Sequence, residues 1–206
     1  MNDAGPSRKT AGVRTGGRSE RVVAAVLDAA LMELASVGYT ALRLDDVATR
    51  AGVAKTTIYR RWPTKIELVG DALRQVTSWH DPLPNHGDVR QDILSLLERA
   101  VRLVNTAQGR AMARVMTTES VAGEFEKLAR QMRDDSRAYR ARIIDNAVAR
   151  GDLPPDTDAT MVMDSIFAPI MSRLVKFGEK VDRATRERIV DLVITGAEHG
   201  GGRAHR

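Results

Sequence analysis

Basic, hydroxyl and aromatic side chains gather in one short segment, residues 55–65, which reads KTTIYRRWPTK and contains no acidic residue. Lysine and arginine bind phosphate oxygens, and threonine hydroxyls bind phosphates or base edges. Residues 1–80 hold twelve Lys and Arg against eight Asp and Glu, a balance of +4, in a chain whose total charge is +5. This composition is typical of a surface that binds nucleic acid, although a solvated basic face has the same composition.

The residue types and their spacing give little support for catalysis, cofactor binding or a metal site. The chain has no cysteine, which excludes thiol nucleophiles, disulfides and cysteine-ligated zinc. We expect no catalytic residue, cofactor or metal site, because we find no phosphate loop, no nucleophile elbow and no pair of histidines at i, i+4 spacing. An enzyme stays open as an alternative, and so does a metal held by His80, Asp81 and His86 in place of a solvated linker.

Length and composition indicate a folded intracellular chain. Its 206 residues, 43% hydrophobic and 29% charged, suffice for one or two domains with a sizeable core. No apolar run approaches the roughly 18 residues that a membrane-spanning helix needs. The first twenty residues also lack the apolar segment of a secretory signal. We therefore expect a cytoplasmic protein without a membrane partner.

The apolar residues recur at intervals of three and four, which predicts an all-α fold. The segments expected to be helical are 19–37, 44–50, 55–61, 64–79, 88–107, 108–118, 121–150, 156–177 and 183–198. Gly38 suits a left-handed helix end, and Pro169 should kink its helix. Residues 1–18 have the composition of a disordered basic arm, and the prolines of 80–87 indicate a linker. The expected domains are thus 19–80 and 81–206.

The two short helices 44–50 and 55–61 are joined by four residues that include Gly52. Such a corner can present its second helix to the major groove of DNA, which is about 12 Å wide. The residues spaced to pack the corner are Val47, Ala48, Val53, Ile58 and Trp62. A helical corner without function has the same geometry. After it, Thr64 and Glu67 form the sequence pattern of a capping box.

The run GYTALRLDDVATRAGVAKTTIYRRWPTKIELV resembles the DNA-binding domain of the tetracycline-repressor (TetR) family. The matching positions are Gly38-Tyr39, Val47-Ala48, Ala51-Gly52-Val53, Ile58-Tyr59, Trp62 and Lys65. The resemblance is specific, but it covers only the N-terminal part of the chain. It implies about nine helices, with three in a helix-turn-helix domain, a fourth that connects, and five in a regulatory domain for ligand binding and dimerisation.

The resemblance also implies which residues meet DNA. Lys55, Thr56 and Thr57 would lie nearest base edges, with Tyr59, Arg60 and Lys65 on phosphates and Arg61 beside them. The chain departs from the family pattern at Arg43, which stands where a capping Thr or Ser is usual and cannot cap a helix through an oxygen. Arg43 either reaches a phosphate or is solvated. The arm residues Arg8, Lys9, Arg14 and Arg18 either enter the minor groove or are inert.

In the second domain, the resemblance implies a ligand pocket and a dimer interface. The candidate pocket residues are Trp79, Leu97, Met112, Met116, Phe125, Tyr139, Met163 and Phe167, although methionines at helical spacing are also ordinary core. The candidate interface residues are Ile170, Leu174, Phe177, Ile189, Val190, Val193, Ile194 and Ala197. The expected function is a repressor that binds a palindromic operator in double-stranded DNA as a homodimer and is released by a small, largely apolar effector. The alternative is an effector-independent or non-specific DNA-binding protein.

Overall fold

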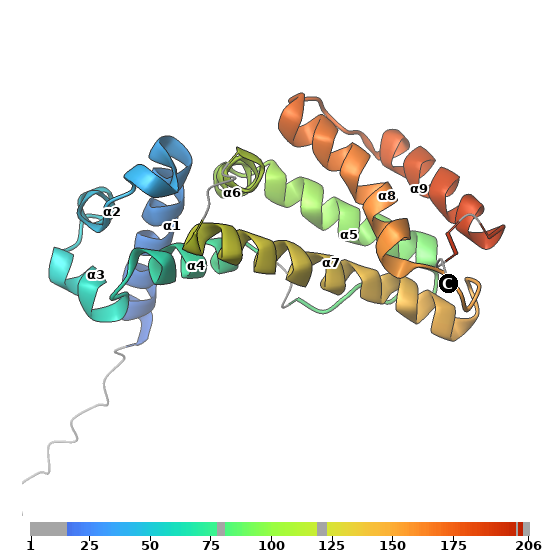
Figure 1. Cartoon of the computed structure of the whole chain (residues 1–206), viewed down its shortest axis with the longest axis horizontal. Coiled ribbons are helices and arrows are strands. Elements are labelled where there is room, and N and C mark those ends of the chain that lie inside the picture. Colours follow the sequence, from blue (N-terminus) through green and yellow to red (C-terminus); the bar gives the residue numbers. More distant parts are fainter. Residues whose placement is uncertain (1–15, 78–80, 119–122, 201, 204–206) are drawn as a thin grey trace, which may run out of the picture.

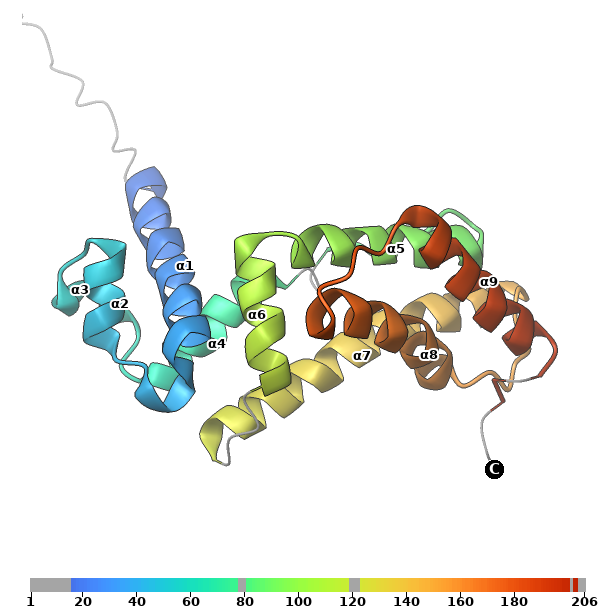
Figure 2. The ribbon, with the colours of Figure 1, turned by 90° about the horizontal axis from the view of Figure 1, so that it is seen from above.

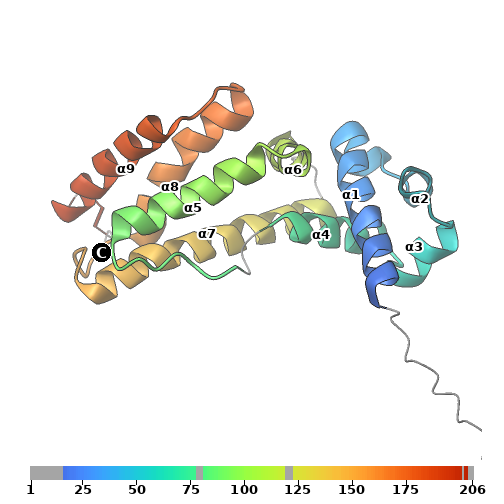
Figure 3. The same cartoon turned by 180° about the vertical axis from the view of Figure 1, so that it is seen from behind.

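The computed structural model describes residues 16–77, 81–118, 123–200 and 202–203. Within these residues the fold is all-α, as predicted, with nine α-helices, one short π-helix and no strand. The elements are α1 (Gly16–Ala41), α2 (Leu44–Ala51), α3 (Lys55–Arg61), α4 (Lys65–Val76), α5 (Val89–Val104), α6 (Ala107–Thr118), α7 (Glu124–Arg150), α8 (Ala159–Met171), η1 (Ser172–Lys176) and α9 (Arg183–Glu198). Helices α1–α3 lie together at one end of the molecule, and α5, α8 and α9 lie at the other (Figures 1 and 3).

The short helices of the N-terminal end begin and end as predicted or within one residue. α3 has the predicted bounds, and α2 extends one residue further, to Ala51. At Gly38 the prediction was only partly right. The residue has φ 76° and ψ 168°, a positive φ but not the left-handed helical conformation, and the chain resumes a helical turn up to Ala41. Gly38 therefore kinks α1 instead of ending it.

Helix α4 links the N-terminal helices to the rest of the molecule (Figure 3). Its capping box is present, since the Thr64 hydroxyl accepts a hydrogen bond from the Glu67 backbone N–H and the Glu67 carboxylate accepts one from the Thr64 N–H. The helix ends at Val76, before the predicted end at residue 79, and Thr77 is already extended. Residues 1–15 of the predicted arm lie outside the described residues, as do Trp79 and His80. The last three residues of that arm, 16–18, belong to helix α1, so the prediction was wrong there.

Two hydrophobic cores share the long helix α7. The first core joins buried residues of α1–α4 to Ala111 and Val115 of α6 and to Phe125, Ala129 and Met132 of α7. The second core joins α5, α8 and α9 to Tyr139, Ile143, Ile144 and Ala147 of α7. Helix α6 lies beside α1 (Figure 2), so the first core includes residues that follow the predicted boundary at residue 81.

The C-terminal helices show where the predicted bounds were wrong. α8 begins at Ala159 because Asp158 caps it by accepting a hydrogen bond from the Met161 N–H. It stops at Met171, six residues before the predicted end, and passes into the π-helical turn η1. Pro169 lies inside α8, two residues before this end, and has no N–H to donate to the preceding turn. α9 has the predicted bounds, and Asp182 caps it.

One stretch of α1, Ser19–Ala41, is apolar and long enough to cross a membrane, with a mean hydropathy of 1.6. The sequence expectation overlooked it because Asp28 and Glu33 interrupt the apolar run. Its apolar face is used inside the protein, where Val26, Ala30 and Leu31 are fully buried and the helix packs on α2 and α4. A core helix satisfies the same length and hydropathy test.

Candidate nucleic-acid interface

The corner between α2 and α3 is closed by Gly52. This residue has φ 66° and ψ 32°, in the left-handed region, and its N–H bonds back to the Ala48 and Thr49 carbonyls. The next N–H, of Val53, bonds to the Ala48 carbonyl at 3.1 Å. A side chain at position 52 would meet no atom within 4 Å, so the backbone conformation and not space demands glycine. At the other end of α2, Arg43 is extended and makes no side-chain cap, as its residue type predicts.

Packing of α3 decides which of its side chains face outward. Ile58 and Trp62 are buried at 0% and 3% exposure, against Val47 and Ala48 of α2 in the first core. The exposed set contains five of the predicted DNA contacts on α3, which are Lys55, Thr56, Tyr59, Arg60 and Arg61. Thr57 is half-buried, and Arg43 before α2 is exposed. The structure therefore gathers seven of the eight predicted DNA-contacting residues around one corner.

An acidic residue stands among these groups. Lys55 Nζ donates to Asp45 Oδ2 at 2.6 Å, and the Tyr59 hydroxyl donates to Asp45 Oδ1 at 3.4 Å. The hydrogen bond from Lys55 is the main reason why the pKa of the Asp45 carboxyl lies below its ordinary value, with smaller contributions from Tyr59 and Arg43. The sequence showed only that Asp45 lies in the first turn of α2, and gave no signal of this pairing.

Lys65, the eighth predicted contact, is turned toward the protein. Its ammonium donates to the Tyr39 carbonyl at 2.7 Å and the Thr40 carbonyl at 3.3 Å, and it lies 4.4 Å from the centroid of the Tyr39 ring. The same ring stacks on Phe125 of α7 with centroids 4.8 Å apart, and its hydroxyl donates to Glu124. Lys65 thus joins the end of α1 to the start of α4, a role that the sequence analysis missed.

The C-terminal end of α3, at Trp62, is held against α4 by hydrogen bonds. The Trp62 indole N–H donates to Asp71 Oδ2 at 2.8 Å, and Arg74 donates to Asp71 Oδ1 at 2.8 Å. Burial alone would raise the pKa of the Asp71 carboxyl, but these two hydrogen bonds outweigh burial and the pKa lies below its ordinary value. A shallow groove of about 790 Å³ between α1 and α3 is lined by valines of α1, by Val53 of the turn before α3, and by Arg60, Arg61 and Trp62.

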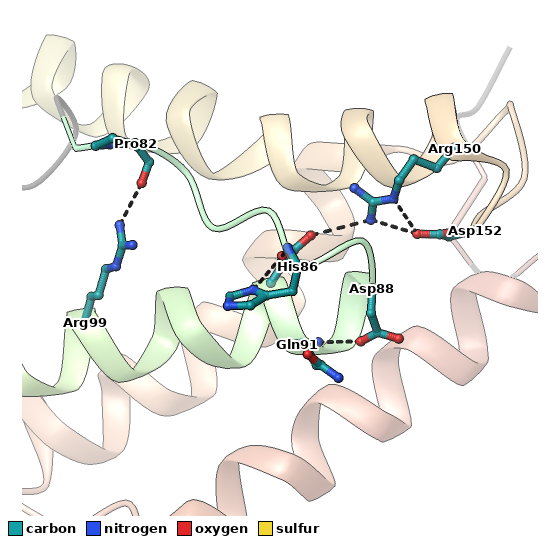
Figure 4. A network of polar contacts seen from close by, with 8 residues as sticks. Pro82, His86, Asp88, Gln91, Arg99, Arg150 and Asp152 are labelled. Carbon is teal, nitrogen blue, oxygen red and sulfur yellow. Dashed lines mark hydrogen bonds and ion pairs between the residues drawn. The ribbon is translucent and has the colours of Figure 1, made fainter.

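The segment before α5 is held by polar contacts with α5 and α7 (Figure 4). Asp92 of α5 is 1% exposed and accepts a hydrogen bond from the His86 backbone N–H at 2.6 Å. The His86 ring nitrogen Nδ1 lies 2.9 Å from the same carboxylate oxygen, and Arg150 of α7 lies 3.5 Å from the other. His86 therefore has a structural partner. Among the described residues no group of three metal-ligating side chains gathers.

The predicted pocket residues fall into the two different cores. Leu97, Tyr139, Met163 and Phe167 are buried in the second core. Phe125 is buried in the first core, and Met112 and Met116 pack against it. Trp79 lies outside the described residues. The structure thus brings four of the eight predicted pocket residues together, in the second core.

Arg140 of α7 is a polar group at the edge of the second core that sequence analysis missed. It lies over the Phe167 ring at 4.7 Å, donates to the Ser136 hydroxyl at 2.6 Å and approaches Asp164 at 3.5 Å. Burial lowers its pKa. Its Nε is buried and has no hydrogen-bond partner within the described residues.

The predicted dimer residues are divided between the core and the surface of one chain. Ile170, Val190, Ile194 and Ala197 are buried in the second core, while Leu174, Ile189 and Val193 are half-buried. Phe177 is 60% exposed, and two further large apolar residues outside the predicted set are also exposed, Leu192 at 77% and Met161 at 50%. Met161 and Leu192 border a hollow of about 170 Å³ with Ser165 and Gly196, between α8 and α9.

Two family models match the chain. The N-terminal model, described as bacterial regulatory proteins of the tetR family, matches residues 26–72. The model described as the tetracyclin repressor-like C-terminal domain matches residues 83–193, more than half of the chain. The first match includes α2, α3 and most of α4, and the second runs from before α5 into α9.

Individual relatives agree with these matches. The chain is similar to the DNA-binding transcriptional repressor TetR of Mycobacteroides abscessus, with 30% identity over 86% of this chain and 94% of that protein. It is also similar to the HTH-type transcriptional regulator AqdR of Rhodococcus erythropolis, with 26% identity over 95% of this chain and 93% of that protein. Among solved structures, the TetR family transcription regulator SCO0332 is 28% identical, covers 85% of this chain and 98% of its own, and has a TM-score of 0.61.

These matches agree with the helix order, the glycine-closed corner and the cationic face of α3. Members of the matched family are DNA-binding regulators and not enzymes. The chain belongs to the TetR family, and it is a helix-turn-helix regulator of transcription.

Proposed function

We propose that the protein is a repressor that binds a palindromic operator as a homodimer and is released by a small, largely apolar effector. The observation that carries this proposal is the exposure of Lys55, Thr56 and Arg60 on a helix whose other side is buried against α1 and α2. A cationic helix of seven residues fits one major groove. Two copies related by a twofold axis would meet two half-sites about 34 Å apart.

The dimer is supported by the surface of α8 and α9. The exposed side chains of Met161 and Leu192 flank the small residues Ser165 and Gly196, which allow two helices to approach closely. Exposed large apolar side chains on adjacent helices are typical of an interface. We therefore propose that this face of α8 and α9, together with Phe177, packs against the same face of a second subunit. The buried residues of the predicted dimer interface would then support this face from inside the subunit.

The effector is supported by Arg140. A buried guanidinium nitrogen without a partner is costly, and here it lies beside Phe167 and the apolar second core. A ligand that entered between α7 and α8 would supply the missing acceptor. Such a ligand acts only if it binds one domain arrangement more tightly than the other. An effector-independent DNA-binding protein is the alternative.

Selection from a random pool of duplexes, followed by footprinting of the selected site, tests this function. We expect a palindromic footprint and an affinity that falls by about 10³-fold or more between about 50 and 200 mM salt. Equal binding to all sequences would favour the non-specific alternative. Absence of binding at low salt would overturn the proposal.

Substitutions on α3 distinguish contacts with phosphates from contacts with base edges. We expect Tyr59→Ala to weaken binding to the selected site and to a scrambled duplex by similar factors, because a phosphate contact carries no sequence information. We expect Thr57→Ala to change the base preference at one position per half-site. Mobility-shift titrations on both duplexes measure this, and equal affinities for wild type and both variants would contradict the contact assignment.

A further inference from the structure

The groove between α1 and α3 borders the proposed DNA-binding surface. Its lining changes in character along the chain, from Val53 and Ala54 just before α3 to Arg60 and Arg61 in the last turn of α3. Valines of α1 line the groove as well, and none of the described residues in this lining is acidic. One end of the groove therefore suits an apolar group, and the other end suits a phosphate.

The two threonines of α3 differ in their surroundings. Thr56 is exposed and lies outside the groove lining, whereas Thr57 is half-buried and lines the groove. The Thr57 N–H donates to the Ala54 carbonyl at 2.9 Å, and residues three apart in a helical turn are neighbours on its surface. Thr57 and Ala54 thus stand side by side in the wall of the groove. A threonine carries a methyl group beside its hydroxyl, so Thr57 can contact an apolar group here.

The order of these residues along α3 decides which part of DNA meets each end of the groove. In helix-turn-helix proteins the N-terminal residues of the second helix contact base edges in the major groove. When α3 lies there, Ala54 and Thr57 meet the bases, and Arg60 and Arg61 lie further along the helix, where they reach phosphates. Base edges present one apolar group in the major groove, the C5-methyl of thymine, which alanine and threonine side chains contact.

We propose that the groove receives the C5-methyl group of one thymine in each half-site, and that Thr57 is a specificity-determining residue that contacts this group through its own methyl. The inference rests on the proposed operator binding and names the base that Thr57 recognises. Arg60 and Arg61 fix the register through phosphates but carry no sequence information. A cytosine at the same position has no methyl group to bury, so it binds less tightly.

The first experiment changes only the DNA. Each thymine of the selected duplex is replaced in turn by deoxyuridine, which lacks the C5-methyl group and keeps the same hydrogen-bonding groups. We expect one position per half-site at which the replacement weakens binding by about fourfold, the effect of burying one methyl group. Replacement in both half-sites should weaken binding by about fifteenfold. The same replacements in a scrambled duplex should change affinity by less than about twofold.

The second experiment changes Thr57 by single groups. Thr57→Ser removes the methyl group and keeps the hydroxyl, and Thr57→Val keeps the methyl group and removes the hydroxyl. At the sensitive position, we expect the preference for thymine over deoxyuridine to fall below about twofold in Thr57→Ser and to stay at about fourfold in Thr57→Val. Thr56→Ser is the matched control and should keep the wild-type preference, because Thr56 lies outside the groove.

The inference is wrong if no deoxyuridine replacement weakens binding, or if the preference for thymine survives in Thr57→Ser. A preference that is lost in Thr57→Val would assign recognition to the hydroxyl and would also overturn it. Each of these results leaves the proposed function intact, whereas a wild type that binds no duplex at low salt would overturn both. Circular-dichroism melting checks that each variant is folded, and the deoxyuridine series needs no variant.

Discussion

Residue types indicated which side chains carry charge, but not where each charge points. Lys55, Arg60 and Lys65 are all cations of one segment, yet they have different surroundings. Arg60 is exposed, Lys55 is paired with Asp45, and Lys65 binds the backbone at the end of α1. These directions depend on the kink at Gly38 and on the α2–α3 angle, which bring residues distant in sequence together. No local pattern encodes them.

The inward position of Lys65 leads to a prediction about stability. Lys65→Ala should remove two hydrogen bonds to backbone carbonyls and the contact with the Tyr39 ring. We expect a loss of about 1–2 kcal/mol, because bonds from a charged donor are stronger than neutral ones, which lowers the melting temperature by about 3–6 °C. Arg60→Ala, at an exposed position, serves as the control and should melt with the wild type in a calorimetric scan. Equal melting temperatures for all three proteins would contradict the structural role of Lys65.

Asp71 gives a prediction about pH. Its pKa lies below the ordinary value in the folded protein, so the carboxylate stabilises the fold above about pH 4 and loses this effect as the pH falls through the folded pKa. Asp71→Asn keeps an acceptor for the Trp62 indole but loses the charge facing Arg74. We expect the variant to melt about 2 °C lower than wild type at pH 7, since the pair is partly solvated. The difference should shrink as the pH falls below about 4 and through the folded pKa, and a difference that does not change with pH would be inconsistent with this linkage.

At the scale of the helices, the sequence predicted best where an end has its own signal. Thr64 with Glu67 marks the start of α4, and Asp182 caps α9, so both starts lie within one residue of the prediction. Boundaries were missed where the signal is weak or ambiguous. Apolar periodicity continues past Val76 and past Met171, but the helices stop there. The spacing of apolar residues indicates which face of a helix is buried, but it does not indicate at which residue the helix ends.

The left-handed turn at Gly52 can be tested by two substitutions. Gly52→Ala places a side chain in a conformation that costs about 1–2 kcal/mol for an L-residue, and we expect a melting temperature about 3–6 °C below wild type. Gly52→Asn should lose less, because asparagine tolerates this conformation better. Thermal melts followed at 222 nm rank the three proteins. Alanine equal to or better than asparagine would show that the turn does not need a positive φ.

At the scale of the molecule, the core to which each candidate pocket residue belongs was the least predictable feature. An apolar stripe along a helix shows that its residues are buried, but it does not predict which of the two cores each residue joins. Phe125 and Tyr139 lie on the same helix α7, but the first is in the N-terminal core and the second in the C-terminal core. Leu192 lies off the apolar stripe of α9 and is exposed, so periodicity gives it no position in either core.

The proposed dimer face leads to a prediction about assembly. Leu192→Glu places a charge on a side chain that is 77% exposed in one chain, so folding of the subunit should be unaffected. In the dimer the charge would be buried without a partner, and we expect dissociation to be favoured by about a hundredfold or more. Gln131→Glu, at an exposed position of α7, adds the same charge elsewhere and should stay dimeric. Sedimentation velocity distinguishes the two, and a dimeric Leu192→Glu protein would place the interface on another face.

The first core has a consequence for recombining parts of related regulators. A chimaera spliced within residues 81–87 would give the N-terminal helices foreign partners for Tyr39, Val26 and Leu31, because Phe125, Ala111 and Val115 would come from the other parent. Such a hybrid needs all the α6 and α7 residues of the first core transplanted together with the N-terminal segment, namely Ala111, Val115, Phe125, Ala129 and Met132. Grafts that include them preserve a complete interior, and grafts that omit them leave apolar side chains facing mismatched neighbours.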